Sequence, residues 1–269
     1  MNIENFINEF VAKNTYITKE NAANEAMIGL KMYDEPLVAY ASAEDGIFHE
    51  YATKKEILQN KFMPPKEWLN EASTVISVFF PLSDEVKKSN AANMDMPSIE
   101  WLQARYEGQE MIVRCTKALV EYLQSSGYAA AAPCVDERKW LSMGDEEHQD
   151  NSYFVPNWSE RHAAFAAGHG TFSLSRGLIT KRGVAGRFTS VITNYFHAPT
   201  PREYTDIYEY CNKCGKCIAN CPAGAISFEH GKQHYPCMLF LDKVEEMCSP
   251  RYGCGKCQVA VPCQNGIPK

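Results

Sequence analysis

The sequence predicts an α/β or α+β domain followed by a small cysteine-rich domain, and three observations support this prediction. Helical and strand-like apolar patterns are intermixed in the first part of the chain, as is typical of a layered domain of mixed class. Nine of the eleven cysteines lie between Cys211 and Cys263. The stretch 197–202, HAPTPR, carries two prolines where the composition changes, and it suits a linker. We therefore place the two domains at residues 1–200 and 201–269.

Two helices are predicted from the spacing of apolar residues and from capping signals. Between residues 3 and 12 apolar side chains recur at intervals of three and four, which predicts an amphipathic helix. Ser98 is suited to cap a longer helix that runs through Leu123, and Gly127 lies just past its expected end.

Three strands are predicted from short runs rich in β-branched and aromatic residues, at 36–41, 74–80 and 188–194. The run 74–80 is apolar almost throughout, so we expect a buried strand that Pro81 ends.

Composition restricts the class of protein. The 269 residues are 45% apolar and 22% charged, which is ordinary for a globular chain. The formal net charge of −6 argues against a dominant nucleic-acid surface. No apolar run approaches the roughly 20 residues that a membrane helix needs, and the N-terminal residues lack the features of an export signal. We therefore expect a cytoplasmic protein that does not bind membranes.

The first run of cysteines has a specific spacing. Cys211, Cys214, Cys217 and Cys221 form C-x2-C-x2-C-x3-C followed by proline. In bacterial-type ferredoxins this spacing presents three thiolates to one 4Fe–4S cluster, and the fourth thiolate reaches a second cluster. Paired C-x2-C elements also bind zinc, but a zinc site does not need the third and fourth cysteines at these spacings. Disulfides are not expected in a chain without a secretion signal.

The second set of cysteines is less regular. A regular repeat of the motif would place its last cysteine at Val261, whereas the chain has Cys263. We assign to the first cluster Cys211, Cys214, Cys217 and Cys263. We assign to the second cluster Cys221, Cys237, Cys254 and Cys257. Cys248 is an alternative to Cys237, and the sequence does not decide between them; the unused cysteine would be a small buried apolar residue.

The stretch 163–187 is rich in glycine and is flanked by Arg and Lys residues. Glycines let a backbone approach a flat or bulky ligand closely, and cations suit phosphate or carboxylate groups. The stretch does not contain the G-x-G-x-x-G dinucleotide fingerprint. A loop of tight turns explains the same glycines equally well.

Three stretches together resemble one known family: 121–136 (EYLQSSGYAAAAPCVD), 166–194, and the cysteine region with Pro236-Cys237-Met238 and residues 252–258. The combination resembles the cobalamin-dependent iron–sulfur reductases, which include epoxyqueuosine reductase and the reductive dehalogenases. The resemblance implies a nitroreductase-like domain that holds a corrinoid, followed by a ferredoxin-like domain with two 4Fe–4S clusters. It also implies that low-potential electrons pass through both clusters to cobalt, which reduces the substrate while a nearby acid supplies a proton.

The resemblance also sets expectations for partners. Epoxyqueuosine reductase has a C-terminal helical-repeat extension that helps it engage tRNA, and this chain stops at Lys269, so tRNA is not expected as a partner. We expect a small organic molecule or a modified nucleoside as substrate, and an electron donor of the ferredoxin or flavodoxin type. The family's Ala-Gly-Leu-Gly segment has His169 in the leucine position.

The resemblance assigns candidate site residues. Asp136 matches the family's proton-donating aspartate, and to donate at neutral pH it would need a pKa raised by burial. Tyr153 is the alternative donor. The expected contacts to the cofactor are Gly168, His169, Gly170, Arg176 and Gly177. For His169 we expect a hydrogen bond rather than ligation of cobalt.

Two other functions remain open at this stage. One is electron transfer without catalysis, in which only the clusters function. Alternatively, the same N-terminal fold holds a flavin in place of cobalamin.

Overall fold

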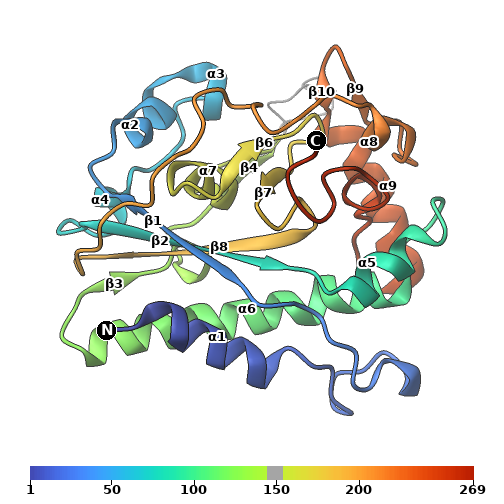
Figure 1. The fold of residues 1–269 in the computed structure, drawn as a ribbon, viewed down its shortest axis with the longest axis horizontal. Coiled ribbons are helices and arrows are strands. Elements are labelled where there is room, and N and C mark those ends of the chain that lie inside the picture. The colour runs from blue at the N-terminus through green and yellow to red at the C-terminus, as the bar shows by residue number, and fades with distance from the viewer. Residues whose placement is uncertain (144–153) are drawn as a thin grey trace.

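The computed structural model describes residues 1–143 and 154–269 (Figure 1). The helices are α1 (Ile3–Asn14), α2 (Gly46–Thr53), α3 (Lys55–Leu58), α4 (Pro65–Trp68), α5 (Asp84–Ala91), α6 (Ile99–Ser125), α7 (Glu160–Ala166), α8 (Lys216–Ala219) and α9 (His234–Cys248), with 3-10 turns η1 (Glu25–Met27), η2 (Pro133–Val135) and η3 (Lys256–Gln258). The strands are β1 (Leu37–Ser42), β2 (Thr74–Pro81), β3 (Ala130–Ala131), β4 (Leu141–Met143), β5 (Phe154–Pro156), β6 (Gly170–Phe172), β7 (Leu178–Thr180), β8 (Gly186–Thr193), β9 (Ile226–Ser227) and β10 (Gly231–Lys232).

The core of the N-terminal part is a four-stranded antiparallel sheet with the order β1-β2-β8-β3. Strand β2 is buried along its whole length, as its apolar run predicts. Because side chains alternate across a strand, Ile76, Val78 and Phe80 pack into one apolar cluster, and Val75 packs into the other. The sheet is therefore covered on both faces.

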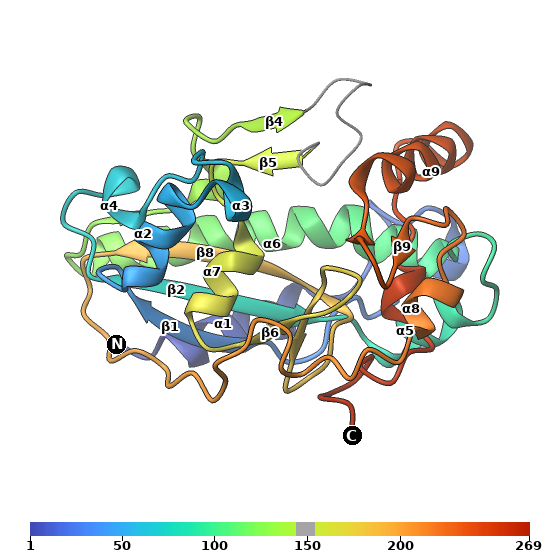
Figure 2. The same ribbon diagram turned by 90° about the horizontal axis from the view of Figure 1, so that it is seen from above.

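Helices α1 and α6 cover one face of this sheet, and α7 covers the other (Figures 1 and 2). The long helix α6 begins where the sequence predicts. Ser98 caps it, since the Ser98 hydroxyl oxygen accepts a hydrogen bond from the backbone N–H of Trp101 at 3.2 Å. Gly127 follows its last turn in the left-handed conformation, with φ +88°.

The predicted fold class is confirmed as a mixed arrangement of helices around an antiparallel sheet. All five elements predicted in the N-terminal part are confirmed, with boundaries that move by at most two residues. Among the helices in the described part of the chain, none combines the length and apolar character needed to cross a bilayer.

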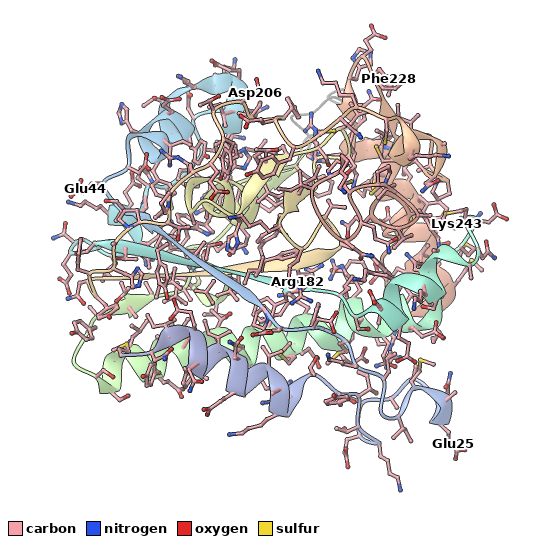
Figure 3. All side chains as sticks on the ribbon, in the orientation of Figure 1. Glu25, Glu44, Arg182, Asp206, Phe228 and Lys243 are labelled. Atoms are coloured by element: carbon pink, nitrogen blue, oxygen red, sulfur yellow. The ribbon has the colours of Figure 1, made fainter. Side chains whose placement is uncertain are left out.

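The cysteine-rich segment consists of short elements that pack against the ends of α5 and α6 (Figure 1). Arg251 and Glu107 form a largely buried ion pair at 2.5 Å. Helix α9 buries a single side chain, Val244, along its length. Phe228 lies at the tip of the β9–β10 hairpin (Figure 3), where it is 65% exposed. This segment has little apolar core of its own, which is typical of small domains that metal ligands hold together.

Candidate metal centre and cofactor recess

The first group of cysteines lines a cavity beneath the β6–β7 hairpin. The sulfur-bearing residues of this cavity are Cys211, Cys214, Cys217 and Cys263, the set assigned to the first cluster. Ser173, Ser175 and Ile179 complete its wall from the hairpin side. Val261, which stands where a regular repeat has cysteine, is buried against Ile179 and Val184 instead.

Burial and repulsion from neighbouring sulfurs disfavour the charged form of two of these thiols, Cys217 and Cys263. Burial, followed by the nearby Cys257 and Cys211, raises the pKa of Cys217 to about 11. Burial, followed by Cys211 and Cys217, raises the pKa of Cys263 to about 12. Thiolates crowded in this way are stabilised when iron neutralises their charge, so the donor set fits a cluster that binds as thiolates lose their protons.

The second group of cysteines gathers around Cys257. Burial raises the pKa of Cys257, and the neighbouring Cys237 and Cys221 raise it further. Burial raises the pKa of Cys254 to about 12, with contributions from Cys257 and Cys237. Four cysteines therefore lie near one another, and they are the set assigned to the second cluster: Cys221, Cys237, Cys254 and Cys257.

Helix α9 contains both candidates for the remaining ligand of the second cluster, Cys237 and Cys248, at opposite ends. Cys237 lies in its first turn and Cys248 is its last residue. At a rise of about 1.5 Å per residue, the eleven steps between them correspond to roughly 16 Å. Since Cys237 influences Cys257, Cys254 and Lys232, the geometry favours Cys237 over Cys248 as the ligand.

The cysteine side chains do not converge on one position that a single metal ion could occupy, within the part of the chain that the structure describes. Within residues 1–143 and 154–269, no three His, Cys, Asp or Glu side chains are placed to share a single metal ion. A tetrahedral zinc site requires four ligands around one ion, whereas a cubane spreads its ligands over four irons.

A cationic cluster of Arg161, Arg176 and Lys232 lies beside the second group of cysteines. Arg161 lies at the start of α7 and is exposed to solvent. The protein atoms around it lower its pKa, as does the charge of Arg176, whereas Cys257 acts in the opposite direction. Since Arg161 is accessible to solvent and yet surrounded by protein atoms, we infer that this cluster lines a recess of the surface. Arg161 Nη1 donates a 2.6 Å hydrogen bond to the backbone oxygen of Arg176.

Two histidines and a lysine share this recess. Burial, Arg161 and Arg176 lower the pKa of His162 to about 3. Burial and the same two arginines lower the pKa of His234 to about 3, so both imidazoles are neutral at pH 7. Lys232 is protonated: although burial opposes it, Cys257 and Cys237 raise its pKa. The recess therefore presents three cations and two neutral imidazoles.

The glycines expected to approach a cofactor are required by packing within the chain. Gly170 has φ +155°, and a Cβ there would overlap the carbonyl oxygen of Ile179 in the β6–β7 hairpin. A Cβ at Gly177 would overlap Val184. At Gly168, with φ +89°, it would lie 3.2 Å from backbone oxygens of the segment that follows β8. Close packing within the chain thus explains all three glycines.

His169 lies in the core rather than in the recess. It is 6% exposed, its Nε2 lies 3.0 Å from the backbone oxygen of Ser77, and burial lowers its pKa to about 4. Arg176, by contrast, is half-buried at the recess, with φ +58°. Of the five expected cofactor contacts, Arg176 is the one whose position suits that role.

The expected raised pKa of Asp136 is wrong for this conformation. Arg138 donates two hydrogen bonds to its carboxylate, at 2.9 and 2.6 Å, and this pairing lowers the pKa of Asp136. Arg138 also donates to the backbone oxygens of Glu67 and Trp68, which fixes its position. Tyr153, the alternative donor, lies outside the described residues.

Glu160 has a carboxyl group with a raised pKa, and the sequence did not predict a role for it. Burial raises its pKa to about 7. Ser190 Oγ donates a 2.6 Å hydrogen bond to Glu160 Oε2, and Trp158 Nε1 donates to Ser190 Oγ at 2.9 Å. Glu160 Oε1 is buried and has no hydrogen-bond partner among the described residues. An acidic residue in the first turn of a helix is ordinarily a stabilising feature, so its position in the sequence carried no functional signal.

Comparison with known proteins agrees with this geometry. Residues 204–227, which hold the first four-cysteine run, match the family of 4Fe–4S binding domains. No curated protein matches the sequence. Among solved structures, a selenomethionine-labelled epoxyqueuosine reductase superposes with a TM-score of 0.53 at 16% identity, over 100% of this chain and 68% of that one. The chain shares its fold with this enzyme.

Two further structures have the same fold. An epoxyqueuosine reductase in complex with an epoxyqueuosine-modified tRNA-Tyr stem loop has a TM-score of 0.52 at 17% identity, over 88% of this chain and 63% of that one. A catabolic reductive dehalogenase has a TM-score of 0.51 at 16% identity, over 86% of this chain and 30% of that one. The chain thus spans less than two thirds of the length of either, and at these identities the likeness establishes the fold alone.

Proposed function

We propose that this protein is an iron–sulfur reductase in which two 4Fe–4S clusters pass electrons to a cobalamin that reduces a small organic or modified-nucleoside substrate. The single observation that carries the proposal is the pair of cysteine groups, the second of which lies beside the cationic cluster of Arg161, Arg176 and Lys232. The fold shared with reductases supports it. Cytoplasmic location and a ferredoxin- or flavodoxin-type donor belong to the same proposal.

The first cluster would be held by the cavity-lining set Cys211, Cys214, Cys217 and Cys263. The second would be held by Cys221, Cys237, Cys254 and Cys257. Cys257 of the second group raises the pKa of Cys217 in the first, so the two groups are close neighbours. Closely spaced clusters suit stepwise electron transfer toward the recess.

The side chains of the recess fit a corrinoid by their donor chemistry. The rim of a corrin and its nucleotide tail carry amide oxygens and a phosphate, which would accept hydrogen bonds from Arg161, Arg176 and Lys232. A cavity of about 90 Å³ between Trp101, Arg105 and Arg187 is too small for a corrin ring. When bound and reduced, such a group supplies two electrons at cobalt.

We assign the proton to Glu160 rather than to Asp136. A carboxyl with a pKa of about 7 is protonated about half of the time at neutral pH, which suits a general acid. The Ser190 hydroxyl orients this carboxyl through Oε2 and leaves Oε1 free to hold the proton. Asp136 and Tyr153 remain the alternative donors.

Anaerobic reconstitution tests the proposal against its two alternatives. Protein reconstituted with iron and sulfide, then incubated with cob(II)alamin and separated from free cofactor, should retain the corrinoid absorption spectrum. A flavin released on denaturation would favour a flavin-dependent reductase instead. Retention of iron with neither cofactor would favour an electron-transfer protein.

A further inference from the structure

The chain contains the same four-residue motif twice, once in each group of cysteines. Residues 214–217 and 254–257 both read Cys-Gly-Lys-Cys. The two glycines share the left-handed conformation, with φ +75° at Gly215 and +68° at Gly255, and a single helical turn follows each, α8 or η3. The two motifs are therefore close matches in sequence and backbone.

The two lysines of these motifs have opposite environments. Lys216 is exposed to solvent. Lys256 is 0% exposed, and its Nζ donates hydrogen bonds to the backbone oxygen of Asn90 at 2.6 Å and to Asn90 Oδ1 at 2.7 Å. Asn90, also buried, donates from Nδ2 to the backbone oxygen of Cys254 at 3.0 Å. Asn90, near the end of α5, thus holds the ammonium group of Lys256 beside Cys254 of the second group.

The hydrogen-bond partners of Lys256 are all neutral oxygens. A buried ammonium group is costly unless an opposite charge lies nearby. Cys254 is two residues away in the chain and shares Asn90 with Lys256 as a hydrogen-bond partner. A cluster held by Cys254 and the other thiolates of this group would supply the negative charge that the buried ammonium group needs.

We propose that Lys256 is a fixed counter-charge for the second cluster, which gives that cluster a higher reduction potential than the first. This inference rests on the proposed two-cluster function. Reduction adds negative charge to a cluster, so a positive charge held nearby in a dry environment favours the reduced form. Lys216 cannot act in this way because water and salt screen an exposed charge. Arg161 and Lys232 also lie near the second group, but both keep contact with solvent.

The test is a redox titration of the reconstituted full-length protein, followed by electron paramagnetic resonance. Lys256→Met removes the charge and keeps the length of the side chain, and Lys216→Met is the matched control in the same motif. We expect Lys256→Met to move the higher of two midpoint potentials to a more negative value, and Lys216→Met to leave both in place. An unmoved higher midpoint in Lys256→Met, or an equal shift in the control, would overturn the inference.

A second variant covers the case in which Lys256→Met fails to fold or loses iron. Asn90→Asp keeps the oxygen that Lys256 binds and adds a negative charge beside it, so it should move the same midpoint in the same direction. A variant that retains its iron and shows no shift would overturn the inference. If the unmodified protein itself binds fewer than about eight irons per chain, the proposed two-cluster function has failed, which is a distinguishable result.

Discussion

Ser190, in the middle of β8, holds Glu160, at the start of α7, through a 2.6 Å hydrogen bond to one carboxylate oxygen and leaves the other buried without a partner in the described part of the chain. The two residues are thirty positions apart in the sequence. Packing of α7 against the sheet brings them together, and burial rather than a charged neighbour is the main cause that raises the pKa of Glu160 to about 7.

Exchange of this carboxyl for an amide should slow the reaction while the protein stays intact. If Glu160 supplies the proton, Glu160→Gln should lower turnover by about 10²- to 10⁴-fold with iron and cofactor content unchanged. Asp136→Asn is the matched comparison, and because Arg138 holds Asp136 ionised, turnover should change only a few-fold. Single-turnover rates measured with a chemical reductant decide the matter, and the reverse ranking would return the role to Asp136.

Stability should depend on pH through the same group. The pKa of Glu160 is raised from 4.5 to about 7 on folding, so between these values the folded state binds a proton that the unfolded state does not. The free energy of unfolding should therefore fall as pH rises from about 5 to 7, by up to about 3 kcal/mol. In Glu160→Gln this slope should be reduced. Denaturant unfolding at several pH values measures it, and identical slopes in the two proteins would contradict the assignment.

The two cysteines of α9 provide a direct test of the ligand set. Cys237→Ser should remove the second cluster and reduce iron from about eight to about four per chain, since Cys237 lies beside Cys257. Cys248→Ser, at the other end of the same helix, should retain all of the iron. Colorimetric iron and sulfide analysis after anaerobic reconstitution gives the answer, and loss of a cluster in the Cys248 variant instead would exchange the two roles.

The turn between β7 and β8 should depend on one glycine, Gly183, for its contact with the C-terminal residues. Gly183 and Gly127 have nearly equal φ values, +84° and +88°, so alanine is equally strained at both. The two sites differ in the space around them. A Cβ at Gly183 would also overlap the backbone of Gln264, whereas a Cβ at Gly127 would meet open space. Gly127→Ala should cost about 1 kcal/mol, and Gly183→Ala about 1–3 kcal/mol more. Denaturant midpoints compare them, and equal values would argue against a tight contact at Gly183.

The sequence predicted those helices and strands whose formation depends on residues close together in the chain. The apolar run of β2 and the Ser98 cap of α6 were readable because strand burial and helix capping depend on neighbours in the sequence. The spacing of Cys211 to Cys221 was equally informative, since a short loop determines how its thiolates are presented.

Features that depend on distant contacts were not readable. The pairing of Asp136 with Arg138, and the anchoring of Arg138 by backbone oxygens near Trp68, reversed the expected pKa of Asp136. His169 has a polar side chain in a glycine-rich stretch, which suggested a ligand contact, yet its partner is Ser77 in the core. Which end of α9 lies beside Cys257 was likewise not readable, and the proposed assignment of Cys237 rather than Cys248 rests on it.

The central claim is that two groups of cysteines hold two cubane clusters beside a recess for a corrinoid. The most direct measurement is joint analysis of iron, acid-labile sulfide and cobalt in protein reconstituted anaerobically and separated from free cofactor. We predict about eight irons, about eight sulfides and one cobalt per chain. Zinc in place of iron, or cysteines linked as disulfides, would contradict the clusters; a full complement of iron without cobalt would contradict the corrinoid site.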